Sequence, residues 1–69
     1  MEILAKRLLE LRHERNMTRK AVTAELNIAE RTYQRYEEAE REPVASVLKD
    51  LADFYGVSAD YLLGRTDQR

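Results

Sequence analysis

The sequence predicts an all-α fold, a compact domain of five helices, on two observations. Only Gly56, Gly64 and Pro43 interrupt a chain that is otherwise rich in helix-forming residues, and few stretches look like β-strands. Apolar residues recur at intervals of three and four, which places them on one face of a helix. A chain of 69 residues is long enough for one small domain, so we treat residues 1–69 as a single unit.

The helices are expected at about residues 2–15, 18–25, 29–38, 44–55 and 58–63. In the first helix, Leu4, Leu8 and Leu11 form one apolar stripe. Asn16 is suited to end this helix in a left-handed conformation, and Thr18 is suited to cap the start of the second helix.

Single residues mark the later helix boundaries. Asn27 lies where the chain must turn sharply, and Asn tolerates a positive φ better than most residues. Pro43 breaks the helical pattern after the third helix, and Gly56 ends the fourth. Ser58 caps the last helix and Gly64 ends it.

Composition excludes several classes of function. The chain has no Cys and a single His, His13, which we place on the surface. Disulfides, thiolate metal sites and a Cys nucleophile are therefore excluded, and we expect no enzymatic activity, no metal and no cofactor. No apolar run approaches the roughly 20 residues that span a bilayer, and the N-terminus lacks a signal-peptide pattern. We therefore expect a cytoplasmic protein without a membrane partner.

Charge alone gives no support for nucleic-acid binding. Charged residues make up 36% of the chain, but they nearly cancel, at a formal net charge of −1. Many DNA-binding domains are basic, because phosphate contacts supply much of their affinity. Support for DNA binding must therefore come from the arrangement of the residues.

The second and third helices form the informative pair. Each is only two or three turns long, and about three residues join them. Helices this short are marginal in water alone, so packing must hold them. Two short helices fixed at an angle by a tight turn are the geometry of a helix-turn-helix. The alternative at this point is an ordinary helical hairpin within a small bundle.

Several segments, in order and at matching spacing, resemble the Cro/repressor-type helix-turn-helix family, the lambda-repressor-like or Xre-family domains. They are residues 7–12 (RLLELR), 17–20 (MTRK), 26–28 (LNI), 32–37 (TYQRYE), 41–43 (REP) and 55–64 (YGVSADYLLG). The resemblance extends over residues 4–67. It implies a compact five-helix fold and a sequence-specific regulator of transcription that binds double-stranded DNA, acting as a repressor by occupying its operator. It also implies a homodimer at least on DNA, and we expect no small-molecule ligand.

One face of the third helix carries the expected base-reading residues, Glu30, Arg31, Gln34 and Arg35. Arg can bind O6 and N7 of guanine, and Gln can bind N6 and N7 of adenine. By resemblance, these four residues occupy the base-reading positions of the family. The alternative is an ordinary solvated helix face.

Further roles follow from the helix start and from the resemblance. The expected phosphate contacts are Thr18, Arg19, Lys20 and Arg41. The first three lie at the positive end of a helix, which favours an anion. Arg12 and Glu37 match a pair that forms a structural salt bridge in the family, the alternative being two unrelated surface charges.

The chain also departs from the family pattern. Arg19 replaces the usual Gln, Asn27 replaces the usual Gly of the turn, and neither Ala29 nor Val44 can cap a helix. Residues 38–40 (EAE) make the following loop acidic where relatives carry a basic one. These departures motivate a second interpretation, a protein-interaction module on the same fold, such as an antitoxin or anti-repressor with weak DNA affinity.

Two sets of apolar residues complete the expectations. The aromatic residues are expected to pack in or around the core and not to stack on bases; they are Tyr33, Tyr36, Phe54, Tyr55 and Tyr61. A second set either forms a self-association surface or is scattered on the exterior, as single apolar residues often are; it comprises Ile3, Leu9, Phe54 and Leu63.

Overall fold

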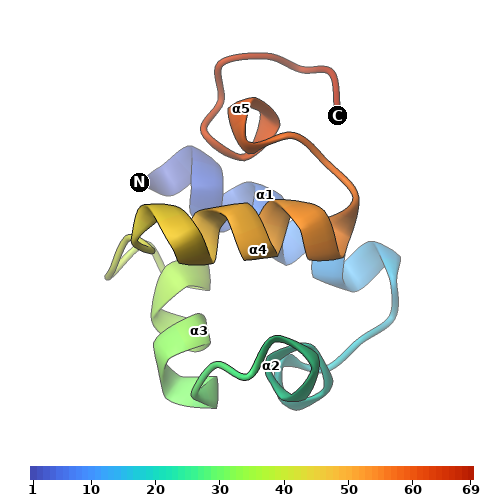
Figure 1. Cartoon of the computed structure of the whole chain (residues 1–69), viewed down its shortest axis with the longest axis vertical. Helices are drawn as coiled ribbons and strands as arrows, with labels where there is room; N and C mark the ends of the chain where they lie inside the picture. The colour runs from blue at the N-terminus through green and yellow to red at the C-terminus, as the bar shows by residue number, and fades with distance from the viewer.

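The computed structural model describes all 69 residues and confirms the expected all-α fold. Its helices are α1 (Glu2–Glu14), α2 (Arg19–Leu26), α3 (Glu30–Glu37), α4 (Ala45–Tyr55) and α5 (Ala59–Leu62). These bounds differ from the expected ones by at most one residue at each end. In Figure 1, α4 crosses the front of the molecule, α1 lies behind it, α5 lies above and the α2–α3 pair lies below.

Every helix contributes side chains to one central core. The core residues are Leu4, Leu8, Leu11, Val22, Tyr33, Tyr36, Leu51, Ala52, Tyr55, Tyr61 and Leu62. The predicted stripe of α1 is thus buried, and the aromatic rings pack in or against the core as expected, with Phe54 at its edge. At the centre, the hydroxyl groups of Tyr33 and Tyr55 form a buried hydrogen bond of 2.6 Å, so that each ring is anchored without an unsatisfied polar atom.

All the helices end in the same way. A residue just after each helix adopts a left-handed conformation, and the amide of the next residue donates to a carbonyl five residues back, the pattern of a Schellman motif. The left-handed residues are Asn16, Asn27, Ala39, Gly56 and Gly64, with φ between 54° and 79°. The sequence predicted four of these stops. It did not predict Ala39, because an alanine gives no signal for a positive φ.

The helix starts are less uniform. The hydroxyl groups of Thr18 and Ser58 accept hydrogen bonds from the amides of Ala21 and Tyr61, at 3.1 and 2.9 Å. Ala29 and Val44 occupy the equivalent positions of α3 and α4 without a side-chain cap. Met1, which precedes α1, provides no side-chain cap either, so three of the five helices begin without side-chain help, and packing must hold their first turns.

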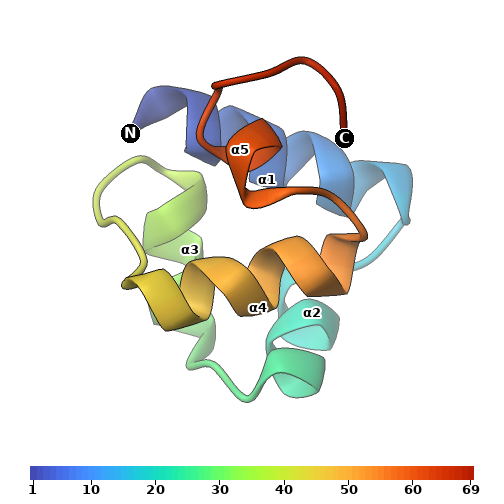
Figure 2. The ribbon, with the colours of Figure 1, turned by 45° about the horizontal axis from the view of Figure 1, so that its top comes forward.

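The segment after α5 folds back over α1, as the two ribbon views show (Figures 1 and 2). Arg7 of α1 donates to the backbone carbonyl groups of Tyr61 and Thr66 and to the carboxylate of Asp67. Arg69 donates through both terminal amino groups to the carboxylate of Glu14. None of the helices combines the length and the apolar character needed to cross a membrane.

Candidate nucleic-acid interface

A turn of three residues holds α2 and α3 at a fixed angle. Asn27 makes the turn possible with its left-handed φ of 56°. Ile28 packs partly into the core, and its amide donates to the carbonyl of Thr23. Val22 of α2 and Tyr33 of α3 are both fully buried, so the two helices share a core side as well as a turn. The short turn and the shared core are the features expected of a helix-turn-helix.

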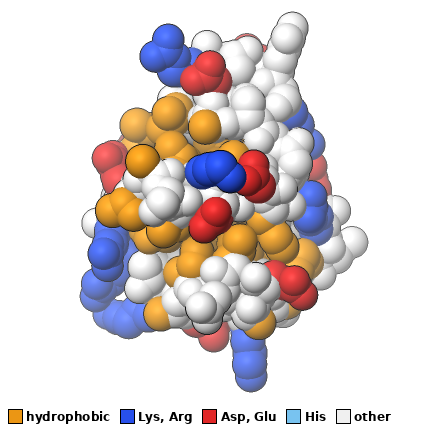
Figure 3. Space-filling view, viewed as in Figure 1, with side chains coloured by type: hydrophobic (Ala, Val, Ile, Leu, Met, Phe, Trp, Pro, Cys, Tyr) orange, Lys and Arg blue, Asp and Glu red, His pale blue; other side chains and the backbone are white.

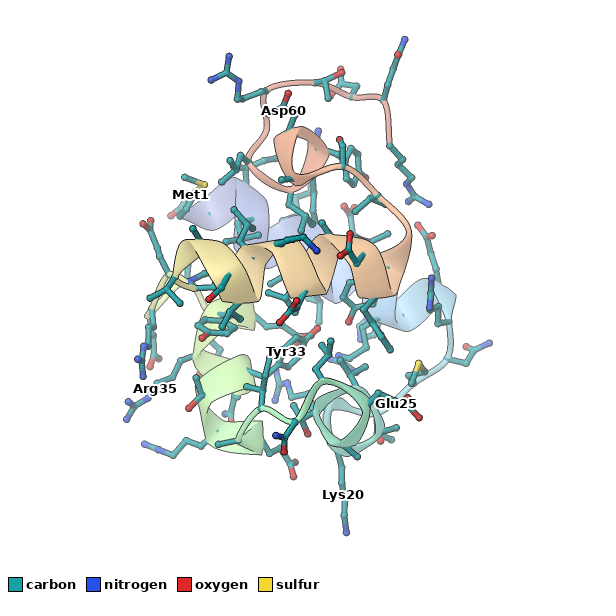
Figure 4. All side chains as sticks on the ribbon, viewed as in Figure 1. Met1, Lys20, Glu25, Tyr33, Arg35 and Asp60 are labelled. Carbon is teal, nitrogen blue, oxygen red and sulfur yellow. The ribbon has the colours of Figure 1, made fainter.

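The two faces of α3 differ sharply. Its inner face buries Tyr33, Tyr36 and Glu37. Its outer face carries the predicted base-reading residues: Glu30 and Arg31 are exposed, and Gln34 and Arg35 are half-buried. Figure 4 shows Arg35 extending away from the body of the molecule.

The outer face of α3 is mostly free of internal contacts. Neither Arg31 nor Arg35 forms an ion pair, whereas the amide group of Gln34 donates to the carboxylate of Glu38 at 3.1 Å. The structure thus brings four polar side chains to one surface, and three of them have no side-chain hydrogen-bond partner.

The predicted phosphate contacts fall into two kinds. Lys20 and Arg41 are exposed and unpaired, and Lys20 points straight out of the lower end of the molecule (Figure 4). The hydroxyl group of Thr18 is engaged with the amide of Ala21, so a role as cap accounts for it. Arg19 is different again, because its Nε donates to Oε1 of Glu37 at 2.9 Å.

The sequence did not predict this contact of Arg19 with Glu37. The residues are 18 positions apart and belong to different helices. Neither helical periodicity nor local spacing could have indicated it.

Glu37 is the centre of a network that joins three helices and the α1–α2 loop. Nε and Nη2 of Arg12 donate to its two carboxylate oxygens at 2.7 and 3.0 Å, and Nη1 of Arg12 donates to the carbonyl of Met17. The Glu37 side chain is 0% exposed. Arg12 and Glu37 are therefore in direct contact and not unrelated surface charges.

The electrostatics of Glu37 keep its carboxylate charged. Burial by itself raises its pKa, but the hydrogen bonds from Arg12 and Arg19 outweigh burial and hold the pKa below its ordinary value. The hydrogen bond to Glu37 in turn raises the pKa of Arg12. The network is therefore an ionised structural cluster that fixes the C-terminal end of α1 against the last turn of α3.

Cations without an acidic partner gather on the helix-turn-helix. Six of the twelve Lys and Arg side chains lack an acidic group within 4.0 Å. They are Lys6, Arg15, Lys20, Arg31, Arg35 and Arg41. Four of the six lie between residues 18 and 41, a range that also holds four acidic side chains without a cationic partner: Glu25, Glu30, Glu38 and Glu40.

Acidic groups limit this concentration of positive charge. Glu38 and Glu40 lie in the loop that follows α3, and both are exposed. Glu25, in contrast, lies on the side of α2 away from α3 (Figure 4). The loop therefore stays acidic beside a surface that otherwise offers cations.

Other surfaces offer little for ligand chemistry. The molecule has no pocket, and no cluster of three or more acidic or His side chains is placed to hold a metal ion. Figure 3 shows apolar side chains above and below the charged outer face of α4, with Val44 as the most exposed large one, at 63%. The residues considered for self-association are each partly buried, so a self-association surface stays a prediction; they are Ile3, Leu9, Phe54 and Leu63.

Known proteins resemble this chain over most of its length. The sequence profile of a family described as "Helix-turn-helix domain" matches residues 3–63. Three similar proteins come from Bacillus subtilis (strain 168). The HTH-type transcriptional regulator ImmR is 39% identical over 64 residues, which is 93% of this chain and 50% of that protein. The HTH-type transcriptional regulator AnsR is 40% identical over 63 residues, 91% of this chain and 54% of that protein.

The third similar protein, the uncharacterized HTH-type transcriptional regulator YobD, is 38% identical over 61 residues, 88% of this chain and 54% of that protein. The chain thus spans about half the length of the curated relatives that it matches. The family match, residues 3–63, spans the helices described above except for Glu2, the first residue of α1.

Proposed function

Because this chain belongs to the helix-turn-helix domain family, we propose that it binds double-stranded DNA sequence-specifically and regulates transcription. One observation carries the proposal: the outer face of α3 presents Arg31, Gln34 and Arg35 on a helix that the buried Glu37 joins to α1 and α2 through hydrogen bonds. Its similarity to proteins named as transcriptional regulators supports it.

In the proposed complex, α3 lies in the major groove. Its first turns bring Glu30 and Arg31 to base edges, and the next turn brings Gln34 and Arg35. Arg side chains suit guanine, Gln suits adenine and Glu suits the amino group of cytosine. Lys20 and Arg41 contact the phosphate backbone on either side of the groove.

We further propose a repressor that acts by occupying its operator, as a homodimer when bound. One such helix reads only a few base pairs, and two copies related by a two-fold axis read half-sites about 34 Å apart. The proposal includes no enzymatic activity, no cofactor and no small-molecule ligand, and it places the protein in the cytoplasm.

The test begins with selection of bound duplexes from a random DNA pool at low salt. We expect a two-fold symmetric site to be enriched, and a mobility-shift titration to show tighter binding to that site than to a shuffled duplex of equal length. Analytical ultracentrifugation of the complex should give two protein chains per duplex. Enrichment without symmetry, or one chain per duplex, would contradict the dimeric mode while leaving DNA binding intact.

A second candidate function is favoured by one specific observation, the acidic pair Glu38 and Glu40 after α3. These carboxylates lie where the DNA backbone would pass, and they suit a protein partner with a basic surface. The candidate is an interaction module such as an antitoxin or anti-repressor. It becomes the better interpretation if the protein binds no duplex at low salt, where electrostatic attraction is strongest.

A further inference from the structure

Only one of the three guanidinium nitrogens of Arg19 forms a hydrogen bond within the protein. Its Nε donates to the buried carboxylate of Glu37, whereas its terminal amino groups have no hydrogen-bond partner. The side chain is 32% exposed, compared with 11% for Arg12. In Arg12, by contrast, all three guanidinium nitrogens donate within the protein. Arg19 is thus the member of the network that still has donors to offer outward.

The surroundings of Arg19 suit an anion. Two arginines share one carboxylate, so the cluster keeps one net positive charge. The backbone amides of Arg19 and Lys20 open α2 and have no hydrogen-bond acceptor, unlike the amide of Ala21, which Thr18 caps. These amides, the terminal amino groups of Arg19 and the exposed Lys20 side chain belong to one short stretch of the chain.

We infer that Arg19 joins a DNA phosphate to Glu37, keeping its Nε on the carboxylate while its terminal amino groups bind the phosphodiester. The inference rests on the proposed function and refines the contact predicted for Arg19. Glu37 occupies the last turn of α3, three residues after Gln34. A phosphate held by Arg19 is therefore coupled through one side chain to the helix that carries the base-reading residues, so that Arg19 is a positioning residue for base reading as well as a phosphate contact.

A planar guanidinium can serve two partners at once, whereas a lysine ammonium is a single point charge. This difference gives the test. Arg19→Lys keeps the charge and loses the bridge, and Arg19→Gln loses both. Lys20→Gln is the matched control, because Lys20 is an adjacent exposed cation without any contact to Glu37. Each variant is titrated with the selected site and with a shuffled duplex over a range of salt concentrations.

We expect Lys20→Gln to lower the slope of log affinity against log salt by about 0.9 per protomer. It should reduce the affinity for the selected and the shuffled duplex equally. Arg19→Gln should lower the slope by the same amount and also reduce the preference for the selected site by about tenfold. Arg19→Lys should keep the slope and reduce the preference for the selected site by the same factor of about ten. A preference unchanged in Arg19→Lys, or a slope unchanged in Arg19→Gln, overturns the bridge.

Nuclear magnetic resonance of the unaltered protein gives a second test, which does not depend on how the variants fold. The Nε–H signal of Arg19 should exchange slowly with solvent in the free protein and remain protected in the complex. Loss of that protection on DNA would show that Arg19 leaves Glu37 to reach the phosphate, which contradicts the bridge. If the unaltered protein binds neither duplex, the proposed function fails as well, and that result is distinct from a preference or slope that stays unchanged.

Discussion

The two ends of the molecule use their arginines in opposite ways. At the α1–α5 end, Arg7 donates to two backbone carbonyls and to Asp67, and Arg69 grips Glu14. At the α2–α3 end, Arg31 and Arg35 have no acidic partner. Both ends belong to a chain with almost no net charge. The difference shows that pairing within the fold, and not the total charge, decides where a protein offers cations to a ligand.

The Glu37 network links these two uses. Arg12 is wholly committed to the fold, whereas Arg19 is only partly so. The unpaired cations of α3 can bind particular base edges only if their helix is held in one position on the protein. The network holds the last turn of α3, and the Schellman motifs fix where each helix ends. The paired arginines thus build the scaffold from which the unpaired ones project.

The largest effect should come from breaking the network. Arg12→Ala leaves Glu37 buried with one of its two cations and the carbonyl of Met17 without its donor, so we expect a loss of about 3–5 kcal/mol in the free energy of unfolding. Urea titration measures it. Lys49→Ala, which removes an exposed ion pair on α4, is the control and should leave the midpoint nearly unchanged. The double variant Arg12→Met with Glu37→Leu should recover part of the loss.

Acid should weaken the same network. The pKa of Glu37 is held below its ordinary value of 4.5 in the folded protein, so its ion pairs stabilise the fold above that pH. The stabilisation is lost as the pH falls through the lowered folded value, because protonation removes the charge that Arg12 and Arg19 share. Thermal melts from pH 7 downward should show a steeper decline for the parent than for the Arg12→Met, Glu37→Leu variant. Parallel declines would mean that Glu37 does not govern acid stability.

Removing one arginine from each end should affect different properties, folding at the α1–α5 end and DNA binding at the α2–α3 end. Arg7→Ala leaves the carbonyls of Tyr61 and Thr66 without their donor, so folding should weaken by about 1–3 kcal/mol while the salt slope of DNA binding stays the same. Arg31→Ala should do the reverse: a loss of about 1–3 kcal/mol in binding to the preferred site, relaxed specificity and an unchanged urea midpoint.

Gln34→Ala should behave like Arg31→Ala in the same mobility-shift titrations. Equal losses on preferred and shuffled duplexes would show that neither side chain reads bases. The outer face of α3 would then contribute phosphate contacts alone.

The residues that could and could not be predicted differ in the range of the interaction involved. The residue types of Asn16 and Asn27 predicted where two helices end, and the apolar stripe of α1 predicted its buried face, because both signals are local. The contact between Arg19 and Glu37 depends on how α2 packs against α3, which no local pattern encodes. Ala39 fell between these cases: its conformation is local, but the residue type that would have signalled it is absent.

Ala39 therefore offers a modest gain in stability. It ends α3 at a φ of 60°, where an L side chain crowds the following carbonyl. Ala39→Gly should raise the free energy of unfolding by about 1 kcal/mol, because relief of that strain exceeds the extra entropy of an unfolded glycine. Ala24→Gly, at an exposed interior position of α2, is the matched control and should destabilise by about 1 kcal/mol. Equal losses in both variants would show that the left-handed stop at residue 39 is not strained.

The smallest effect concerns the loop that Ala39 centres, where unpaired carboxylates meet the surface of unpaired cations. Glu38 and Glu40 flank Ala39, and the amide of Glu40 completes the stop of α3 by donating to the carbonyl of Arg35. The loop position is thus fixed by the backbone, so changing the side chains should alter charge and not geometry. Glu40→Lys with Glu38→Asn removes two negative charges and adds one positive charge beside the proposed path of the phosphates.

Binding to every duplex should strengthen in this double variant, and the salt slope should steepen by about 0.9 for each additional phosphate that the protein neutralises. The preference for the selected site should change little, because phosphate contacts carry no base information. One linked effect limits that expectation: Glu38 accepts a hydrogen bond from Gln34, so the Glu40→Lys single variant, which leaves that bond intact, separates charge from the orientation of Gln34. If neither variant binds more tightly than the parent at low salt, the loop does not face DNA, and the acidic surface is better explained by a protein partner.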